Sequence, residues 1–229
     1  MLILAISTSS KICSVALLED DKVLKELNIE NQKTHSENLL PLIDKLFKYV
    51  KKNISELNLI ACDNGPGSFT GIRIGIATVK AIAEANQIPV VSCSSLEALS
   101  YNIYATTTTL CSMIDARNNQ VYCGIFDKNH NLLENYIADD INTIITVLKH
   151  YKDLSFVGDG ANLHHNLLSG ILCADNNIHA GNVGICGFNK YQNSIYETAD
   201  SIVPMYLRKS QAERMKDLKW VIWKLRVWQ

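Results

Sequence analysis

The stretch of sequence that decides the fold is the glycine-rich run Gly65-Pro66-Gly67-Ser68-Phe69-Thr70-Gly71-Ile72-Arg73-Ile74-Gly75. An apolar run at residues 57–62 precedes it, and a helical pattern follows it. Glycine permits backbone angles and close approaches that other residues forbid. Before a helix, such a loop can hold an anion on its unpaired N–H groups. It can equally be a plain structural turn, or a surface against which another helix packs.

The spacing of these glycines excludes the strict phosphate-binding and nucleophile motifs. No Lys follows Gly71, as a Walker A loop requires, and Gly65, Gly67 and Gly71 are spaced one residue too far for the dinucleotide fingerprint. Ser68 has glycine at −1 rather than at −2 and +2, so it is not a nucleophile elbow. The glycine-rich run can therefore still be a structural turn, an anion-binding loop or a packing surface.

Composition narrows the class of protein. The chain has 229 residues, of which 47% are hydrophobic and 20% charged, which suits one large domain or two small lobes. A net charge of −1 provides no global basic field for nucleic acid. Seven cysteines without a CxxC pair are typical of buried thiols in a reducing compartment, not of a disulfide framework or zinc site. Without a signal peptide or membrane-length apolar run, we expect a cytoplasmic protein with no membrane partner.

The first half of the chain predicts an α/β arrangement. Alternating patterns indicate three strands in a meander at residues 2–6, 12–18 and 22–29. A capping box, Thr34 to Glu37, begins a helix whose apolar stripe runs to Val50 and which Pro41 is expected to bend. A strand at 57–62, the glycine loop, a helix at 70–86, a strand at 89–93 and a short helix capped by Ser94 or Ser95 follow.

The second half repeats the opening pattern at a constant offset of 108 residues. Ile6, Leu24 and Glu26 fall opposite Ile114, Leu132 and Glu134. The repeat predicts two lobes, residues 1–105 and 106–208, each opening with a three-stranded meander. A helix near 141–151, a strand at 154–158, a turn at 158–160 and a helix near 161–168 complete the second lobe, while 170–200 give weak signals.

The last 21 residues, 209–229, form a basic and aromatic tail. From Pro204 onward the chain has seven Lys or Arg and two Asp or Glu. Such a tail can contact RNA or an acidic partner, or it can be an ordinary solvated end. Its structure and role stay open.

A duplicated meander of this kind is similar to the actin/hexokinase/Hsp70 (ASKHA) two-lobe fold. In that fold, turns of both lobes clasp the phosphates of ATP, and an acidic residue at the first turn handles metal or water. Asp159 can serve such a turn, or simply accept N–H bonds within it. The residues we expect nearest a nucleotide or anion are Thr8, Ser9, Gly65, Gly67, Ser68, Asp159 and Gly160.

Eight short motifs occur in an order that resembles the bacterial TsaB (YeaZ) family. They are LAISTS at 4–9, CSVAL at 13–17, HSENLLP at 35–41, GPGSFTGIRIG at 65–75, SSLE at 94–97, DAR at 115–117, GDG at 158–160 and PMYLR at 204–208. The resemblance covers most of residues 1–208. It implies a part in forming N6-threonylcarbamoyladenosine (t6A) at adenosine 37 of tRNAs that read codons starting with A.

The resemblance also implies partners and an interface. TsaB is the pseudo-enzyme partner of TsaD, which holds the metal and transfers the threonylcarbamoyl group, and the small ATPase TsaE binds the pair. Contact with tRNA is then indirect. TsaB and TsaD dock through first-lobe helices, and we expect homodimers through the same surface when TsaD is absent. The interface residues we expect are His35, Leu39, Leu40, Ile43, Phe47, Gly71, Arg73, Gly75 and Val79.

The residues themselves also argue against catalysis. The metal site of the paralogous TsaD uses two histidines four apart on the first helix, whereas here His35 is followed at that spacing by Leu39. The family usually carries Asp at position 7; Ser7 is a poorer partner for Mg²⁺. We therefore expect no catalytic residue, metal or cofactor, with weak nucleotide binding left open. Gly71 and Gly75 each cost about 0.5–1 kcal/mol in a helix, which a closely packed partner helix would offset.

Two other classes of function remain as alternatives. A small kinase or ATPase of the same fold would need carboxylates aimed at the cleft, and nucleotide turnover would reveal it. A metallopeptidase would need a bound metal or a nucleophile–base pair, and the sequence contains no HExxH motif.

Overall fold

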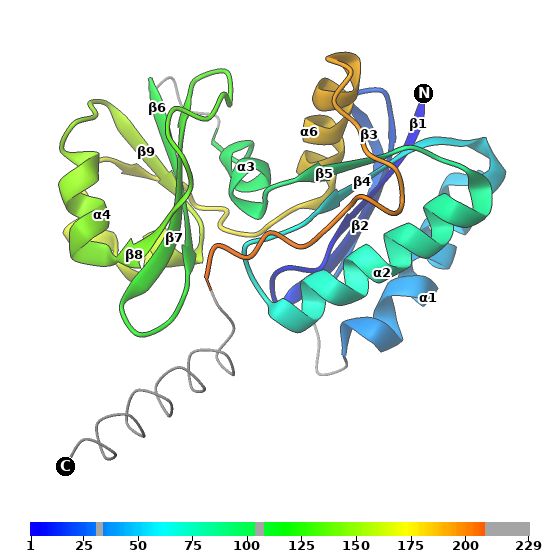
Figure 1. Ribbon diagram of the computed structural model, residues 1–229, viewed down its shortest axis with the longest axis horizontal. Coiled ribbons are helices and arrows are strands. Elements are labelled where there is room, and N and C mark those ends of the chain that lie inside the picture. The colour runs from blue at the N-terminus through cyan, green and yellow to red at the C-terminus, as the bar shows by residue number, and fades with distance from the viewer. Residues whose placement is uncertain (31–33, 104–107, 209–229) are drawn as a thin grey trace, which may run out of the picture.

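The computed structural model describes residues 1–30, 34–103 and 108–208, which form two five-stranded sheets (Figure 1). The strand order of the first sheet is β3-β2-β1-β4-β5, and that of the second is β10-β9-β6-β7-β8. The first sheet comprises β1 Leu2–Ser7, β2 Ile12–Glu19, β3 Lys22–Glu30, β4 Leu57–Asp63 and β5 Val90–Cys93. The second comprises β6 Thr109–Asp115, β7 Gln120–Asp127, β8 Ile137–Asp140, β9 Leu154–Val157 and β10 Ile171–Leu172.

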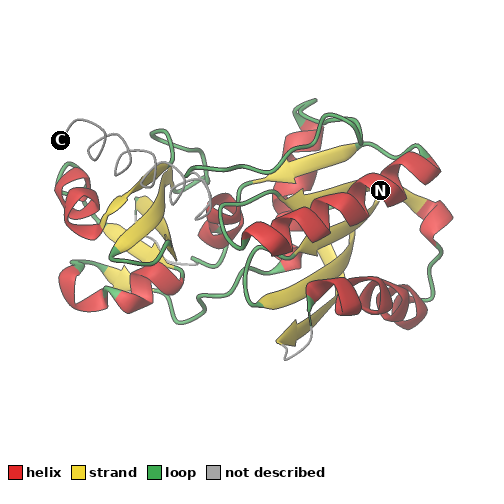
Figure 2. Ribbon diagram, turned by 60° about the horizontal axis from the view of Figure 1, so that its bottom comes forward, coloured by secondary structure: helices red, strands yellow, loops and turns green. Residues whose placement is uncertain are grey.

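Helices cover both faces of each sheet, so the molecule is layered. Alternation along β1 sends Leu4 and Ile6 toward α1 His35–Val50 and α2 Phe69–Asn86, which lie together on one face (Figure 2). Ile3 and Ala5 point to the other face, toward α3 Ser95–Ser100 and α6 Ala180–Gln192. Helices α4 Ile141–Leu148 and α5 Asp159–Leu163 cover the outer face of the second sheet, and the short 3₁₀ helices are η1 Ile54–Glu56 and η2 His165–Leu167.

Helix α6 crosses back from the second lobe and packs against β1, β2 and β4 of the first sheet. The sequence analysis missed this helix because its glycines weaken the helical pattern. They allow a close fit instead: a Cβ at Gly184 would lie 2.3 Å from a methyl of Leu18, and one at Gly187 would lie 2.5 Å from Cβ of Ala61. The division of the chain at residue 105 stays a prediction, but residues 180–192 pack with the first sheet.

The two meanders are similar but not equivalent along their whole length. An offset of 108 maps β1 and β2 onto β6 and β7. The same offset is wrong for the third strand. Ile12 of β2 pairs with Glu30 of β3, whereas the equivalent Gln120 of β7 pairs with Asp140 of β8, which lies two residues later than the offset predicts. After an isolated bridge between Phe126 and Leu132, the chain leaves the ladder before β8 begins.

None of the described helices is both long and apolar enough to cross a lipid bilayer. The basic tail, residues 209–229, lies outside the residues that the structure describes.

Candidate functional site

The turn between β1 and β2 is held by a buried carboxylate at the end of the neighbouring parallel strand β4. The hydroxyl of Ser7 donates to Oδ2 of Asp63 at 2.7 Å, and the hydroxyl of Ser9 donates to the same oxygen. The backbone N–H of Thr8 donates to Oδ1 at 3.3 Å, and Ser95, at the start of α3, reaches Oδ2 at 3.4 Å. The four donors come from two segments of this chain and converge on one carboxyl group.

Asp63 is 2% exposed, and its electrostatics follow from that burial. Desolvation raises the pKa of Asp63, and the hydrogen bonds from Ser9, Ser7, Thr8 and Ser95 oppose the rise. The sequence analysis missed this residue. The signal that could have found it was an acidic side chain at the carboxyl end of an apolar strand, directly before the glycine loop.

The glycine loop closes over the same turn. The N–H of Ser68 donates to the carbonyl of Ser9 at 2.7 Å, and a Cβ at Gly67 would lie 2.3 Å from that carbonyl oxygen. A Cβ at Gly71 would lie 2.0 Å from the carbonyl oxygen of Thr8. The loop is therefore a packing surface, but its partner is the first turn of this chain.

The same contact explains Gly75, and it corrects the expectation that a partner helix makes both glycines necessary. A Cβ at Gly75 would lie 2.3 Å from the hydroxyl oxygen of Thr8, and this hydroxyl donates to the carbonyl of Gly71 at 2.9 Å. Both glycines are buried in the single chain. The close approach that offsets their helix cost is internal.

The residues expected near a nucleotide fall into two separate groups. Thr8 is buried against Gly71 and Gly75, Ser9 is buried against Gly67, and only Ser68 among the first-lobe set is exposed. In the second lobe, Oδ1 of Asp159 accepts the N–H of Asp115 at 3.0 Å, and Gly160 packs on the backbone of β6. Desolvation and the nearby charge of Asp115 raise the pKa of Asp159. Their contact with a nucleotide stays a prediction.

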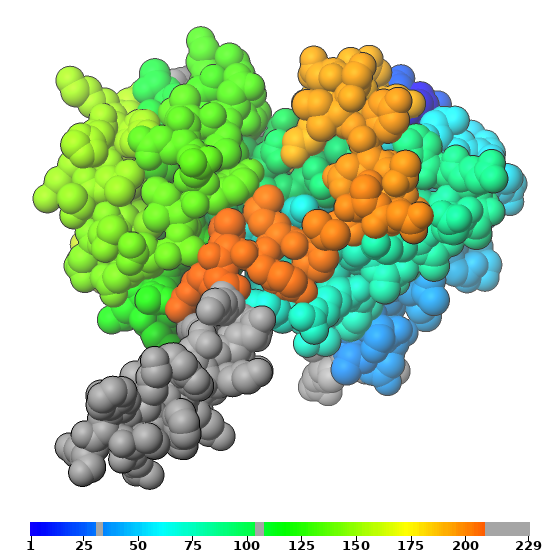
Figure 3. Space-filling model, in the orientation of Figure 1, coloured from blue at the N-terminus to red at the C-terminus, as the bar shows by residue number. Residues whose placement is uncertain are grey.

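A C-terminal segment runs across the mouth between the two lobes (Figure 3). The N–H of Met205 donates to the carbonyl of Asn64 at 2.7 Å, beside the glycine loop. The ring of Tyr206 stacks on Phe69, with centroids 4.8 Å apart, and its hydroxyl accepts from Nε of Arg73 at 2.8 Å. This segment ties the end of the described chain to the start of α2.

Of the nine expected interface residues, most belong to the core of the first lobe. Those that are buried are Leu39, Ile43, Phe47, Gly71, Gly75 and Val79. Leu40 is 58% exposed, Arg73 is exposed, and His35 is half-buried with Nε2 2.9 Å from the carbonyl oxygen of Ser10. A partner on α1 and α2 can therefore touch few of the residues expected from the sequence, because the apolar stripe of α1 faces its own sheet.

One serine and one histidine lie close enough to resemble a nucleophile–base pair. The hydroxyl of Ser100 lies 2.9 Å from Nδ1 of His130. That hydroxyl is fully buried and also donates to the carbonyl of Glu97 at 2.7 Å, while His130 stacks on Tyr101. A buried hydroxyl is out of reach of a peptide substrate, so the pair serves the packing of α3.

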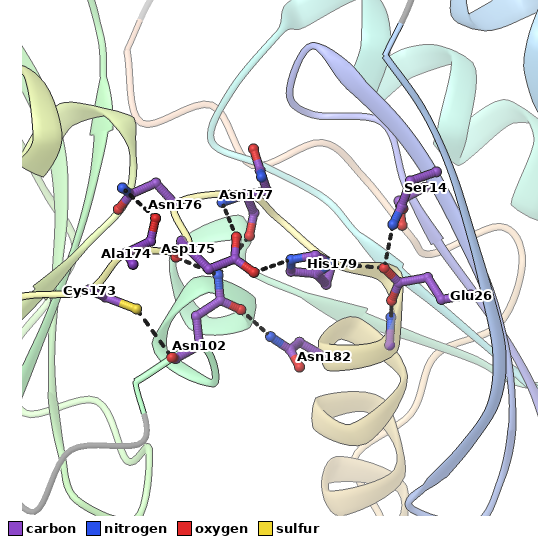
Figure 4. A network of polar contacts seen from close by, with 12 residues as sticks. Ser14, Glu26, Asn102, Cys173, Ala174, Asp175, Asn176, Asn177, His179 and Asn182 are labelled. Carbon is purple, nitrogen blue, oxygen red and sulfur yellow. Dashed lines mark hydrogen bonds and ion pairs between the residues drawn. The ribbon is translucent and has the colours of Figure 1, made fainter.

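A charged cluster holds β3 against the segment that crosses from the second lobe to α6 (Figure 4). Nδ1 of His179 lies 2.8 Å from Oε1 of Glu26 on β3, and Nε2 lies 2.8 Å from Oδ2 of Asp175. The hydrogen bond and charge of Glu26, with those of Asp175, raise the pKa of His179 to about 9. The imidazole is therefore protonated at neutral pH and links β3 to the crossing segment.

Comparison with known proteins places this geometry in a family. The family model described as TsaD, tRNA N6-adenosine threonylcarbamoyltransferase, matches residues 23–219. A Bacillus subtilis (strain 168) protein named tRNA threonylcarbamoyladenosine biosynthesis protein TsaB is 30% identical over 96% of this chain and 98% of its own length. The chain belongs to the TsaB family.

Solved structures agree with this assignment. YeaZ from Pseudomonas aeruginosa is 26% identical with a TM-score of 0.76, covering 90% of this chain and 99% of that one. A ROK hexokinase from Thermus thermophilus is 8% identical with a TM-score of 0.52, covering 84% and 100%, which shows the fold alone. The expected TsaB resemblance and the ASKHA fold are confirmed.

Proposed function

We propose that this chain is a non-catalytic subunit in t6A biosynthesis, which supports a TsaD-like transferase. Membership of the TsaB family supports a role in t6A biosynthesis. The observation that carries the non-catalytic role is the saturation of the first turn. Asp63 accepts hydrogen bonds from Ser7, Thr8 and Ser9, and the glycine loop packs on the same turn.

The chemistry of the fold explains why that observation matters. A turn that handles Mg²⁺ or phosphate must offer carboxylate oxygens or N–H groups that the protein itself leaves open. Here Asp63 would have to give up its internal donors before it could bind a cation. Breaking hydrogen bonds to a buried charged group costs about 1.5–3 kcal/mol each. This cost favours a structural role for the turn.

The proposed partners are a TsaD-like subunit and a TsaE-like ATPase, with tRNA reached through the complex. The docking surface we propose is the outward face of α1 and α2, where Leu40 and Arg73 are exposed. Tyr49 is 64% exposed at the other end of α1. The exposed apolar side chains of Leu40 and Tyr49 on α1 favour association, and the same face would support homodimers when the partner is absent.

A reconstituted tRNA-modification assay tests this function. We expect threonylcarbamoylation to require the chain, although the isolated chain turns over no nucleotide. Leu40→Asp should weaken partner binding at least about tenfold, because it places a charge on an apolar contact. Leu163→Asp is the matched control, because Leu163 is 59% exposed on α5 of the second lobe. Full modification without the chain, or nucleotide turnover by it alone, would contradict the proposal.

A further inference from the structure

Four ionisable side chains gather where β5, α3 and α6 meet. Cys93 ends β5, Glu97 lies on α3, and Cys186 and Lys190 lie on α6. Both thiols are buried, whereas the side chains of Glu97 and Lys190 are 16% and 25% exposed. One donor atom from each of Cys93, Glu97 and Cys186 lies within 4.8 Å of the other two.

We propose that Cys93, Glu97 and Cys186 form a binding site for a thiophilic divalent cation such as Zn²⁺. Two thiolates and one carboxylate are a donor set that zinc accepts, and water can fill the fourth position. Zinc bonds of about 2.0–2.3 Å place tetrahedral donors about 3.5–3.8 Å apart. The three donors already face one another, and side-chain shifts of about 1 Å complete the geometry.

The ammonium group of Lys190 holds the place of the cation in the metal-free protein. Its Nζ donates to Oε2 of Glu97 at 2.6 Å and to the carbonyl of Ser92 at 3.2 Å. Two thiolates and a carboxylate carry three negative charges, which Zn²⁺ and the Lys190 ammonium together balance. The metal-free cluster, with both thiols protonated and Glu97 paired to Lys190, is also neutral. Neither form leaves an uncompensated charge in the interior.

Binding is coupled to proton release because thiolates, not thiols, ligate the metal. One proton leaves each of Cys93 and Cys186 as each sulfur–metal bond forms. The partly exposed Glu97 and Lys190 side chains provide the route from solvent.

The position of the site gives the ion a structural role. Helix α3 packs against β6 and β7 of the second sheet, whereas α6 packs against β1, β2 and β4 of the first. An ion shared by Glu97 of α3 and Cys186 of α6 therefore holds together a helix that contacts the second sheet and a helix that contacts the first. A second thiol pair provides a comparison: Sγ of Cys111 and Sγ of Cys123 lie 3.5 Å apart in the second lobe, and within the described residues no other His, Cys, Asp or Glu completes a metal set there.

Cobalt(II) titration of the full chain, reduced and freed of metal with a chelator, tests the proposal. We expect one equivalent of Co²⁺ to bind, with the near-ultraviolet charge-transfer band of thiolate ligation. Zn²⁺ should displace it and raise the melting temperature. Two protons should be released per ion.

Variants assign the ligands. Cys93→Ser and Cys186→Ser should abolish the band, Glu97→Gln should weaken Co²⁺ binding at least about tenfold, and Cys111→Ala should leave it unchanged. Circular dichroism checks that each variant is folded. If the cysteine variants do not fold, the Co²⁺ affinity of Glu97→Gln tests the proposed site. No charge-transfer band in the folded wild type overturns the proposal. A band that survives loss of Cys93 or Cys186, or an unchanged affinity in Glu97→Gln, also overturns it.

Discussion

The contact between α2 and the first turn predicts that two glycines one helical turn apart respond differently to the same pair of substitutions. A Cβ at Gly75 meets only the hydroxyl of Thr8, at 2.3 Å, whereas a Cβ at Gly71 meets the main-chain oxygen of Thr8, at 2.0 Å. Both distances are shorter than 3.0 Å, a separation below which real Cβ atoms are essentially never found. A side chain can be removed by mutation, and a main-chain oxygen cannot.

The magnitudes follow from opposing effects. Gly75→Ala gains about 0.5–1 kcal/mol of helix propensity but costs about 1–3 kcal/mol in overpacking, a net loss of up to about 2.5 kcal/mol. In the Thr8→Ala background the obstruction is absent, so Gly75→Ala should become stabilising by about 0.5–1 kcal/mol. The coupling free energy is then about 2 kcal/mol. Gly71→Ala should cost about 3 kcal/mol or more in both backgrounds, with little coupling.

Denaturant unfolding of the six isolated proteins measures this double-mutant cycle. The wild type, Thr8→Ala, both glycine variants and both double variants are compared at one pH. Stabilisation of the isolated chain by Gly75→Ala with Thr8 intact would contradict an internal packing role for this glycine. Such a result would mean that the glycine is kept for a partner helix and not for the fit to Thr8.

Two further predictions concern titratable groups. Ser7→Asp would place a second carboxylate within about 3 Å of Asp63, and the two carboxylates would share a proton. The folded protein would then bind more protons than the unfolded protein. Stability should fall by about 2–4 kcal/mol as pH rises from about 4 to 7, without any gain in nucleotide hydrolysis; unfolding curves that do not change with pH would count against this. The pKa of His179, raised to about 9, predicts a contribution of up to about 3 kcal/mol that is fully present below about pH 6.5 and lost as pH rises through about 9. Glu26→Gln should shrink that window, and an NMR titration that finds an ordinary pKa for His179 would contradict it.

Much of the first lobe could be predicted because its signals are local. Alternation defines β1 to β3, and the Thr34–Glu37 pair marks the start of α1, where Oε2 of Glu37 accepts the N–H of Thr34 at 3.0 Å. Ser94, one of two candidates, is the N-cap of α3. Such signals need only a few consecutive residues, so a single sequence carries them.

The errors lie where distant segments decide the outcome. Nothing near Gly71 or Gly75 in the sequence says that the close neighbour is Thr8, more than 60 residues earlier, and not a second protein. The same holds for Asp63, whose donors come from the first turn and from α3. The third strand of the second meander moved by two residues because its connection left the sheet, a tertiary effect that no repeat pattern reveals.

We propose that this chain supplies shape and no reacting group to t6A formation. The rate of threonylcarbamoyl transfer in the reconstituted complex, carrying Asp115→Asn and Asp159→Asn together, tests it most directly. Asp115 ends β6 and Asp159 begins α5, at the second-lobe turn, and the amide oxygen introduced at position 159 can still accept the N–H of residue 115. We expect a rate within about twofold of wild type, whereas removing a true general acid or base lowers the rate by about 10²–10⁴-fold. A loss of that size, with the complex intact, would contradict it.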